Sequence, residues 1–324
     1  MAVLVTGGAG YLGSICASEL VKAGGEVVVY DNFSTGHRAA VGPGVVLVEG
    51  DILDSATVRR VCCEYRIGAV VHMAASALVG ASMCDPRVFY RNNVTGSLAL
   101  LDGIISARVQ KVVFSSSAAV YGEATEMPIA EDHRTVPVNA YGDTKLAIER
   151  ALAWYHRAYG LDSVVLRFFN AAGATDSLGE DHCPETHVLP NLFRCAGDRS
   201  QTFEIYGEDY GTPDGTCVRD FIHALDVAEA HIAALASLEV SGCRFYNIGS
   251  GLGVSIQQLV AAVESVTGSG LSIRIAPRRP GDPATLIACI SRVERELGWK
   301  PRHSDLRSIV MSAWRWHVLH PNGY

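Results

Sequence analysis

A glycine-rich stretch near the N-terminus constrains this chain more than any other feature. Residues 2–5 form an apolar run that predicts a buried strand, and apolar residues at helical spacing begin soon after it. Between them stand Gly7, Gly10 and Gly13, and Gly8, Gly10 and Gly13 also match the G-x-G-x-x-G spacing. Strand, glycine turn and helix in this order are the context of a dinucleotide fingerprint. Glycines let backbone N–H groups at a helix N-terminus approach a pyrophosphate closely.

An acidic residue follows the glycine turn at the distance that a dinucleotide site requires. A second strand is predicted over residues 26–30 and ends at Asp31, about 20 residues past the glycines. A carboxylate there accepts both ribose hydroxyls and repels a 2′-phosphate, so NAD is expected rather than NADP. The alternative is a glycine turn without a ligand beside a surface acid, which the combination of strand, turn, helix and acid disfavours.

Further strands and helices alternate along the first half of the chain. Strands are expected at 45–49, 69–75 with its exit loop, 111–114 and 163–168, and helices at 54–65, 86–107 and from Tyr141 onward. This rhythm predicts an α/β fold with a doubly wound, mostly parallel Rossmann-type sheet. Asp51 is expected near adenine, and His72 is expected to be a packed polar residue.

The strand–helix rhythm weakens after residue 173, where loops lengthen and prolines recur. We therefore predict an NAD-binding domain at 1–173 and a smaller α/β substrate-binding lobe at 174–324. Segments at about 215–260 are expected to return to the first domain. Within the lobe, we predict an edge strand at 203–207 and helices at 255–267 and 292–297.

Composition narrows the partners and the compartment. The 324-residue chain has a net charge of −7 and no Lys/Arg cluster, so a nucleic-acid partner is not expected. Its nine cysteines are scattered without a C-x-x-C pair, which indicates free thiols and no metal site. A first strand at residue 2 leaves no room for a signal peptide, and no apolar run is long enough to span a bilayer. We therefore expect a cytoplasmic protein.

Catalytic side chains are expected where the fifth strand meets the next helix. Ser115, Ser116 and Ser117 follow that strand, and hydroxyls at a strand's carboxyl end point into the ligand crevice of such sheets. A serine turn without a function is the alternative. Tyr141 and Lys145 lie four residues apart and so share one helix face. The ammonium group of Lys145 is expected to favour the tyrosinate form of Tyr141.

Two arginines of the second lobe are candidates to bind an anion. Arg219 and Arg279 carry guanidinium groups, which suit bidentate phosphate recognition. The alternative for each is an ordinary surface or ion-pair role.

Taken together, these motifs resemble the UDP-glucose 4-epimerase family of the extended short-chain dehydrogenase/reductase superfamily. The resemblance spans essentially the whole chain, and its most specific block is Thr-Pro-Asp-Gly-Thr-Cys-Val-Arg-Asp at 212–220. The other matching stretches are 3–13, 31–32, 90–94, 115–122, 141–145, 167–170, 279–282 and 320–324.

The resemblance implies a tightly held NAD and a UDP-sugar substrate. The implied NAD contacts are Gly7, Gly10, Tyr11, Leu12, Gly13, Asp31, Asn32, Phe33, Ser34, Thr35, Gly36, Asp51, Ile52, Met73, Ala74, Ala75, Asn92, Ser115, Ser117, Tyr141, Lys145 and Phe169. The implied substrate contacts are Ser117, Tyr141, Asn170, His187, Val188, Glu204, Tyr206, Arg219, Arg279 and Asp282.

The implied reaction interconverts UDP-glucose and UDP-galactose. Tyr141 takes the proton of the sugar 4-hydroxyl while hydride leaves carbon 4 for NAD, and Ser117 bridges the hydroxyl and the tyrosine. The 4-keto sugar then turns, and hydride returns to its opposite face. The resemblance also implies a homodimer built through the helices at 86–107 and 141–159.

Two positions differ from the pattern of other family members, and several other activities are alternatives. Ala77 replaces a lysine that some members have near the cofactor phosphates, and Leu286 stands at the position of the family's size gate. The preferred sugar, among hexoses, N-acetylhexosamines, uronates and pentoses, stays open, as do the physiological direction and pathway. Ala118 and Ala119 lack the carboxylates of dehydratases and decarboxylases, and Asp31 disfavours an NADP-dependent reductase. A non-catalytic NAD-binding protein is the rival from a different class.

Overall fold

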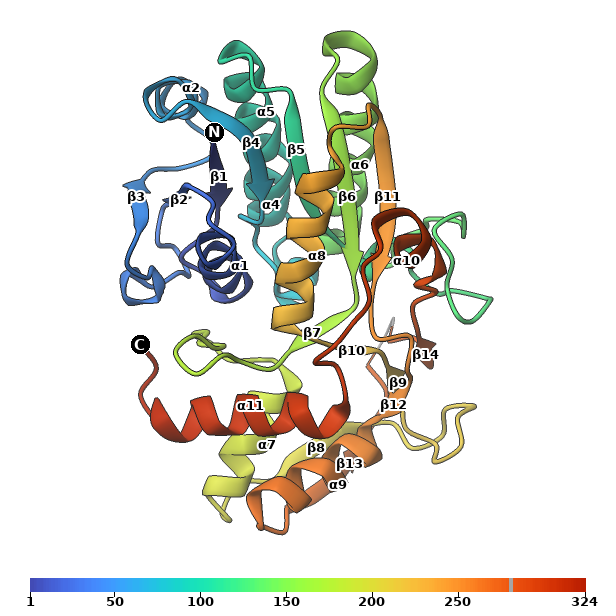
Figure 1. Cartoon of the computed structure of the whole chain (residues 1–324). Coiled ribbons are helices and arrows are strands. Elements are labelled where there is room, and N and C mark those ends of the chain that lie inside the picture. Colours follow the sequence, from blue (N-terminus) through green and yellow to red (C-terminus); the bar gives the residue numbers. More distant parts are fainter. Residues whose placement is uncertain (280–281) are drawn as a thin grey trace.

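A seven-stranded parallel sheet forms the centre of the structure, a computed structural model that describes residues 1–279 and 282–324 (Figure 1). The strand order is β11-β6-β5-β4-β1-β2-β3, and every neighbouring pair is parallel. The strands are β1 Ala2–Thr6, β2 Val27–Asp31, β3 Val45–Glu49, β4 Ile67–His72, β5 Lys111–Ser117, β6 Asp162–Phe168 and β11 Cys243–Ile248. This order contains the Rossmann arrangement 3-2-1-4-5-6, so the predicted fold class is confirmed.

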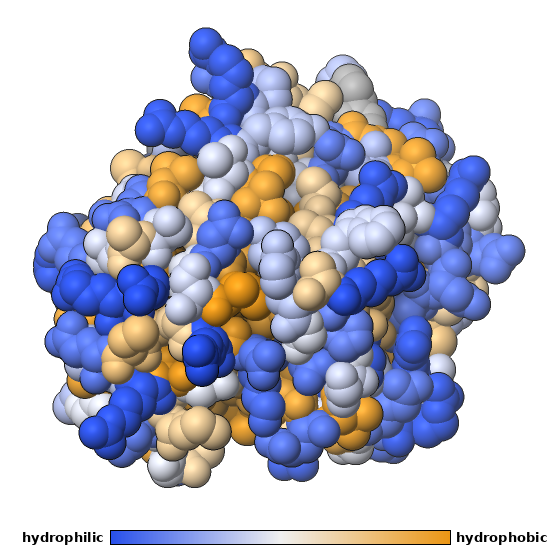
Figure 2. Space-filling view, turned by 90° about the horizontal axis from the view of Figure 1, so that it is seen from above, coloured by the Kyte–Doolittle hydropathy of each residue, from blue (hydrophilic) through white to orange (hydrophobic). Residues whose placement is uncertain are grey.

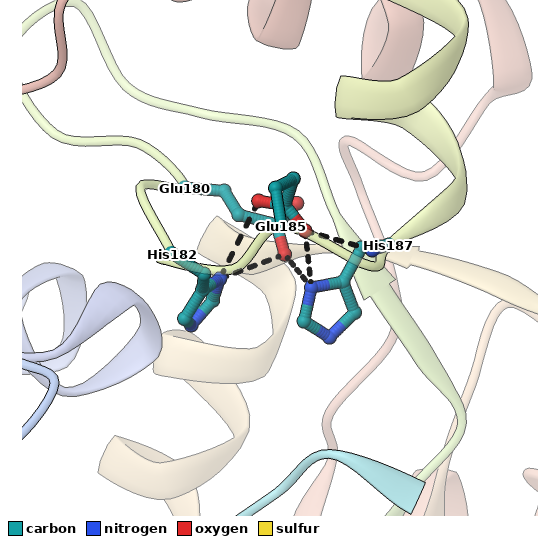
Figure 3. Close-up of side chains that lie close together, drawn as sticks. All are labelled: Glu180, His182, Glu185 and His187. Atoms are coloured by element: carbon teal, nitrogen blue, oxygen red, sulfur yellow. Dashed lines mark hydrogen bonds and ion pairs between the residues drawn. The ribbon is translucent and has the colours of Figure 1, made fainter. Parts of the chain in front are cut away.

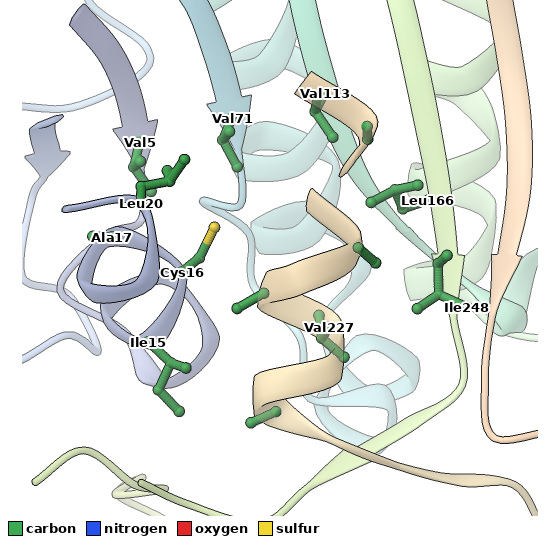
Figure 4. Close-up of a cluster of buried hydrophobic side chains, with 14 of the residues drawn as sticks. Val5, Ile15, Cys16, Ala17, Leu20, Val71, Val113, Leu166, Val227 and Ile248 are labelled. Carbon is green, nitrogen blue, oxygen red and sulfur yellow. The ribbon is translucent and has the colours of Figure 1, made fainter. Parts of the chain in front are cut away.

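Helices cover both faces of the sheet (Figure 1). Helices α1 (Tyr11–Lys22) and α8 (Ala224–Ser237) pack on one face, and α2 (Ser55–Glu64), α5 (Ser97–Ser106) and α6 (Ala140–Tyr159) pack on the other. Figure 4 shows how Val5 and Val71 of the sheet meet Cys16 of α1 and Val227 of α8. Their neighbours Leu4 and Val70 point to the opposite core, because successive strand residues alternate between faces. Burial on both faces explains why the strands are apolar throughout.

The helix predicted over 86–107 is continuous in space but is not one α-helix. It consists of α4 (Pro86–Phe89), a π-helical segment η2 (Tyr90–Gly96) and α5. The wider π turn encloses the Asn93 side chain, whose amide nitrogen donates to Ser76 O at 3.0 Å and to Thr144 Oγ1 at 3.1 Å. Sequence periodicity missed this segment because the distortion is fixed by contacts with a distant loop and with α6.

The second lobe lies beyond the carboxyl ends of the strands, at the lower end of Figure 1. Its core joins side chains of α7, β8, α9 and α11. The remaining elements are η1 Arg38–Ala40, α3 Val79–Cys84, η3 Ala118–Val120, β7 Asn170–Ala172, α7 Val188–Gly197, β8 Phe203–Tyr206, β9 Val218–Arg219, β10 Phe221–His223, β12 Val254–Ser255, α9 Ile256–Thr267, β13 Ile273–Ala276, β14 Thr285–Leu286, α10 Ser291–Leu297 and α11 Leu306–Leu319.

The chain crosses between the two lobes more than once. After β10 it returns to the sheet, where α8 packs beside α1 and β11 pairs with β6. The lobe division at residue 173, with its returning segment, remains a prediction. Seen from the amino ends of the strands, the surface intersperses hydrophilic and hydrophobic residues (Figure 2). None of the helices in the described ranges is both long and apolar enough to cross a membrane.

A buried ion pair joins α6 to the sheet. Glu149 accepts hydrogen bonds from Arg167 Nε at 3.0 Å and Nη2 at 2.7 Å, and both side chains are almost completely buried. Ser116 Oγ adds a third hydrogen bond to the carboxylate at 2.5 Å. Because these partners satisfy both charges, removal of one partner leaves the other charge uncompensated in the protein interior.

We therefore expect Glu149→Ala to lower the free energy of unfolding by about 3–5 kcal/mol, because it strands the Arg167 charge. Urea unfolding followed by circular dichroism measures this loss. Glu239→Ala is the matched control, because Glu239 pairs with Lys111 at the surface with 82% of its side chain exposed. The control should cost less than about 1 kcal/mol. Equal losses in the two variants would show that burial of the pair makes no difference.

Candidate active site

The predicted functional residues gather at the carboxyl ends of the sheet strands. Beneath these ends lies a cavity of about 1180 Å³ between the sheet and the second lobe. Its walls come from the loop after β4, from α3, from β7, from the beginning of α7 and from β8. This is the edge at which open α/β sheets bind their ligands.

The glycine turn brings β1, α1 and the loop after β4 into backbone contact. Gly7 has φ +71°, and a Cβ atom there would lie 2.6 Å from the Ala74 backbone nitrogen. A Cβ atom on Gly13 would lie 2.0 Å from Gly7 O, so only glycine allows α1 to start this close to the turn. Gly10 is the N-cap of α1 and provides no side-chain cap. The first N–H groups of α1 are therefore available to a phosphate, which fits the pyrophosphate of NAD.

Asp31 connects the glycine turn to the loop after β2. Its carboxylate accepts hydrogen bonds from Ala9 N at 2.9 Å and from Phe33 N at 2.8 Å. Nearby, Asn32 Nδ2 donates to Asp51 Oδ2 at 3.0 Å. The residues predicted to hold the adenosine half of NAD thus lie side by side, and each carboxylate oxygen of Asp31 keeps a lone pair for a ribose hydroxyl.

The structure brings Ser117, Tyr141 and Lys145 together at the end of β5. Helix α6 begins with Asn139 as its N-cap, which accepts from Gly142 N at 2.8 Å. A Cβ atom on Gly142 would lie 2.4 Å from Ala119 O, so the glycine lets the first turn of α6 press against the chain that follows Ser117.

Burial moves the pKa values of the two helix residues in opposite directions. Burial raises the pKa of Tyr141 to about 12, and the hydrogen bond with the Ser117 hydroxyl opposes this shift. Burial lowers the pKa of Lys145 to about 7, and the Glu149 carboxylate acts in the opposite direction. Burial is therefore the dominant influence on both groups, and the expected support of the tyrosinate form by Lys145 stays a prediction.

Lys145 nevertheless lies where its charge can reach the phenol. Its Nζ atom is 5.8 Å from the centroid of the Tyr141 ring and donates to Ser115 O at 2.8 Å. His72, at the end of β4, is buried between Thr6 Oγ1 at 2.8 Å and Ser97 Oγ at 2.7 Å. Burial lowers the pKa of His72 to about 3, so it is a neutral packed residue, as predicted.

The predicted substrate contacts other than Ser117 and Tyr141 all line the cavity. They are Asn170, His187, Val188, Glu204, Tyr206, Arg219, Arg279 and Asp282. Arg219 forms an ion pair with Asp282, and the Arg279 guanidinium lies 3.7 Å from the centroid of the Tyr206 ring. The ion-pair role considered for Arg219 therefore applies. Pro280 and Gly281, part of the matching 279–282 stretch, lie outside the described residues.

The predicted size gate lies beside the arginine pair. Leu286 of β14 pairs with Arg219 of β9 and packs against the apolar cluster that contains Phe169. Ala77 lines the cavity, as do Leu78 and Val79, which the sequence did not single out. Small and apolar wall residues of this kind carry no signal in a single sequence, because only the fold turns them toward a ligand.

Sequence reasoning also missed a cluster of two carboxylates and two imidazoles at the cavity wall. The residues are Glu180, His182, Glu185 and His187, all from the segment that precedes α7 (Figure 3). Burial tends to lower the pKa values of the two histidines, but the neighbouring carboxylates outweigh it. They raise the pKa of His182 to about 9 and that of His187 to about 10. The expectation of no metal-binding set considered cysteines and overlooked this stretch.

Comparison with known proteins places these features in a family. Residues 3–249 match the NAD dependent epimerase/dehydratase family. The UDP-glucose 4-epimerase of Corynebacterium glutamicum is 49% identical over 315 residues, which cover 97% of this chain and 95% of that protein.

Two solved structures are similar over nearly their whole length. The UDP-glucose 4-epimerase of Brucella ovis in complex with NAD has a TM-score of 0.94 and 46% identity, with 97% of each chain covered. That of Bifidobacterium longum in complex with NAD+ and UDP has a TM-score of 0.95 and 37% identity, with 100% of each chain covered.

The contacts of Gly13 generate a prediction for cofactor binding. Gly13→Ala forces the start of α1 away from Gly7 and should weaken NAD binding at least about tenfold, equivalent to about 1.4 kcal/mol. NAD released from the purified protein by heat denaturation measures the loss. Gly270→Ala is the control, because a Cβ atom there meets no atom within 4 Å. Normal NAD content in the Gly13 variant would contradict the role given to the turn.

Proposed function

The chain belongs to the NAD-dependent epimerase/dehydratase family and epimerises UDP-sugars with NAD as its cofactor, and we propose that it interconverts UDP-glucose and UDP-galactose at carbon 4. One observation carries this proposal. A serine, a tyrosine and a lysine come together at the end of β5, and a large cavity with two arginines in its wall lies beyond the same strand ends. The names of full-length relatives that are 44–49% identical support the same reaction.

NAD would be held by the glycine turn, by Asp31 and by the residues at the ends of β4 and β5. When bound, it supplies the hydride acceptor and donor for carbon 4 of the sugar. Tyr141 serves as the acid–base residue, since its phenolic oxygen removes the proton of the sugar 4-hydroxyl and returns it later. The Ser117 hydroxyl orients this exchange by hydrogen bonding, and the charge of Lys145 favours the phenolate form.

The uridine diphosphate would occupy the cavity of the second lobe. Arg219 and Arg279 offer guanidinium groups to the diphosphate, and Asn170, His187 and Val188 form the wall nearer the sheet. The cavity, at about 1180 Å³, is slightly larger than the usual range of about 300–1,000 Å³ for ligand pockets. Room for the sugar to turn is what an epimerase needs, because the hydrogen must return to the opposite face of carbon 4.

The residues next to Ser117 argue against a dehydratase. Elimination of water requires an additional acid and base close to the sugar. Ala118 and Ala119 form the short helix η3 at this place and provide neither. Burial of polar and charged side chains costs free energy. A purely NAD-binding role would not explain why Tyr141 and Lys145 are buried.

We expect Tyr141→Phe to reduce the conversion of UDP-galactose to UDP-glucose by about 10²-fold or more, because the proton acceptor is lost. Product analysis by chromatography measures turnover, and NAD content and UDP binding should stay normal. Tyr159→Phe is the matched control, since Tyr159 is 55% exposed and lies at the opposite end of α6 from Tyr141. Full activity in Tyr141→Phe would overturn the assignment of the base. Stoichiometric NADH or a 4-keto-6-deoxy product from the unmodified protein would rule out epimerisation.

We also propose that the protein is a homodimer through the helical face formed by residues 86–107, which comprise α4, η2 and α5, and by residues 141–159 of α6. Large hydrophobic side chains are exposed on this face, with Val88 at 53%, Tyr90 at 41%, Trp154 at 65% and Tyr159 at 55%. Large exposed apolar patches mark interaction sites on protein surfaces. Burial of these side chains between two copies would remove them from water.

Trp154→Glu should therefore convert the dimer to a monomer at micromolar concentration, because it places a charge in the apolar contact. Sedimentation velocity measures the change. Leu252→Glu is the control, since Leu252 is 62% exposed in the loop before β12 and lies outside this face. An unmodified protein that sediments as a monomer would refute the proposed dimer.

A cytoplasmic location is proposed from the thiols. Each of the nine cysteines is free, and Cys16, Cys62 and Cys195 are buried as small apolar side chains. Free thiols in this number suit a reducing compartment.

A further inference from the structure

Four potential metal ligands converge beside the large cavity, and two of them, Glu180 and His187, line it. Glu180, His182, Glu185 and His187 each offer one ligand atom, and these four atoms all lie within 4.8 Å of one another. His187 Nδ1 is 2.8 Å from Glu180 Oε1 and 2.9 Å from Glu185 Oε1. His182 Nδ1 is 3.4 Å from Glu180 Oε1 and 3.7 Å from Glu185 Oε2. Figure 3 shows the two imidazoles turned toward the paired carboxylates.

We propose that these four side chains bind one divalent transition-metal ion, with zinc as the best match. Zinc bonds to histidine nitrogen and carboxylate oxygen are about 2.0–2.2 Å long, so a tetrahedral ion separates its ligand atoms by about 3.3–3.6 Å. The histidine-to-carboxylate separations run from 2.8 to 3.7 Å, with Glu185 contributing Oε1 toward His187 and Oε2 toward His182, so small side-chain shifts would bring four ligand atoms to that spacing. Two imidazoles and two carboxylates are donors that zinc accepts, whereas magnesium and calcium prefer oxygen alone.

The environment of His182 supports a ligand at this point. Its Nδ1 atom is buried and has no hydrogen-bond partner within residues 1–279 and 282–324. The contact with Glu180 is close, but its direction does not suit a hydrogen bond. A metal ion between the two groups would satisfy the nitrogen and both carboxylates at once.

The backbone that carries the cluster is held in place by the C-terminus. Gly179 N donates to Tyr324 Oη at 3.0 Å, and Tyr324 N donates to Asp181 Oδ2 at 3.1 Å. On the other side, the cluster meets α7, because His187 is the N-cap of that helix. The segment therefore presents its ligands from a fixed loop, which reduces the entropy cost of binding an ion.

A second group of possible metal ligands is less suited to bind an ion. Asp226, Glu229 and His303 also lie close together. Asp226, however, accepts hydrogen bonds from Arg302 N at 2.7 Å, from His303 N at 3.0 Å and from Ser304 Oγ at 2.5 Å. Asp226 is completely buried and accepts from three donor groups of another segment, whereas the only backbone N–H that Glu185 accepts from in the described residues is that of His187. The second group therefore serves as an internal control.

The ion would have a structural role and would also orient a residue of the substrate cavity. Four protein ligands close the coordination sphere of zinc, which is typical of structural sites rather than catalytic ones. Coordination through Nδ1 of His187 leaves its Nε2–H free, and this residue lines the cavity. The ion would thus fix the His187 ring and its tautomer while Nε2 donates toward the bound nucleotide.

The test measures metal content in the full-length protein. The chain is treated with a chelator, loaded with zinc sulfate, desalted and analysed by mass spectrometry for zinc per chain. We expect one zinc in the wild type and in the control His303→Gln. We expect at least about tenfold weaker zinc binding in His182→Gln and in Glu185→Gln. His182→Cys should restore binding, because a thiolate is also a zinc ligand.

Thermal unfolding provides a second measurement for variants that fold poorly. Added zinc should raise the Tm of the wild type and His303→Gln, and leave that of His182→Gln unchanged. A wild type that retains no zinc, or equal zinc in all variants, would overturn the site and leave an ion-pair cluster only. Neither measurement involves turnover, so the result is independent of whether the proposed epimerisation is correct.

Discussion

The contact between the glycine turn and the loop after β4 is the constraint on which the rest of the site depends. Gly7 and Gly13 have no room for a Cβ atom, so β1, α1 and Ala74 meet backbone to backbone. That approach aims the open N-terminus of α1 at the strand ends. Asp31 then ties the neighbouring loop to the turn through Ala9 N. A small steric condition thus sets where a dinucleotide can lie and which strand ends surround it.

Desolvation governs the chemistry beside this turn. Tyr141 and Lys145 are both buried, and burial shifts their pKa values toward the neutral forms. The ion pair of Glu149 and Arg167 lies one helical turn farther along α6 and provides the charge that opposes this effect at Lys145. The positioning of the catalytic groups and the stability of the sheet therefore share one buried polar network. A change in that network should affect both properties together.

The second lobe completes the site through segments that are distant in sequence. Arg219 meets Asp282, and Arg279 lies over Tyr206, so the anion-binding wall is assembled from three separate stretches. The segment at 180–187 closes the same cavity and carries the proposed metal ligands. Its anchorage to Tyr324 links the end of the chain to the substrate wall. The lobe thus brings two guanidinium groups to the cavity, and Asp282 and Tyr206 hold them in place.

The sequence by itself determined the features that depend on local patterns. The strand–glycine–helix opening, the alternation that produces the parallel sheet and the spacing of Tyr141 and Lys145 are all set by nearby residues, and the structure agrees with them. The substrate contacts in the cavity were predicted from the family resemblance. Only the tertiary structure decided the π turn at 90–96, the dominance of burial over the Ser117 hydrogen bond at Tyr141 and the convergence of Glu180 with His187. These outcomes depend on distance, packing and desolvation between segments, which spacing along a chain does not encode.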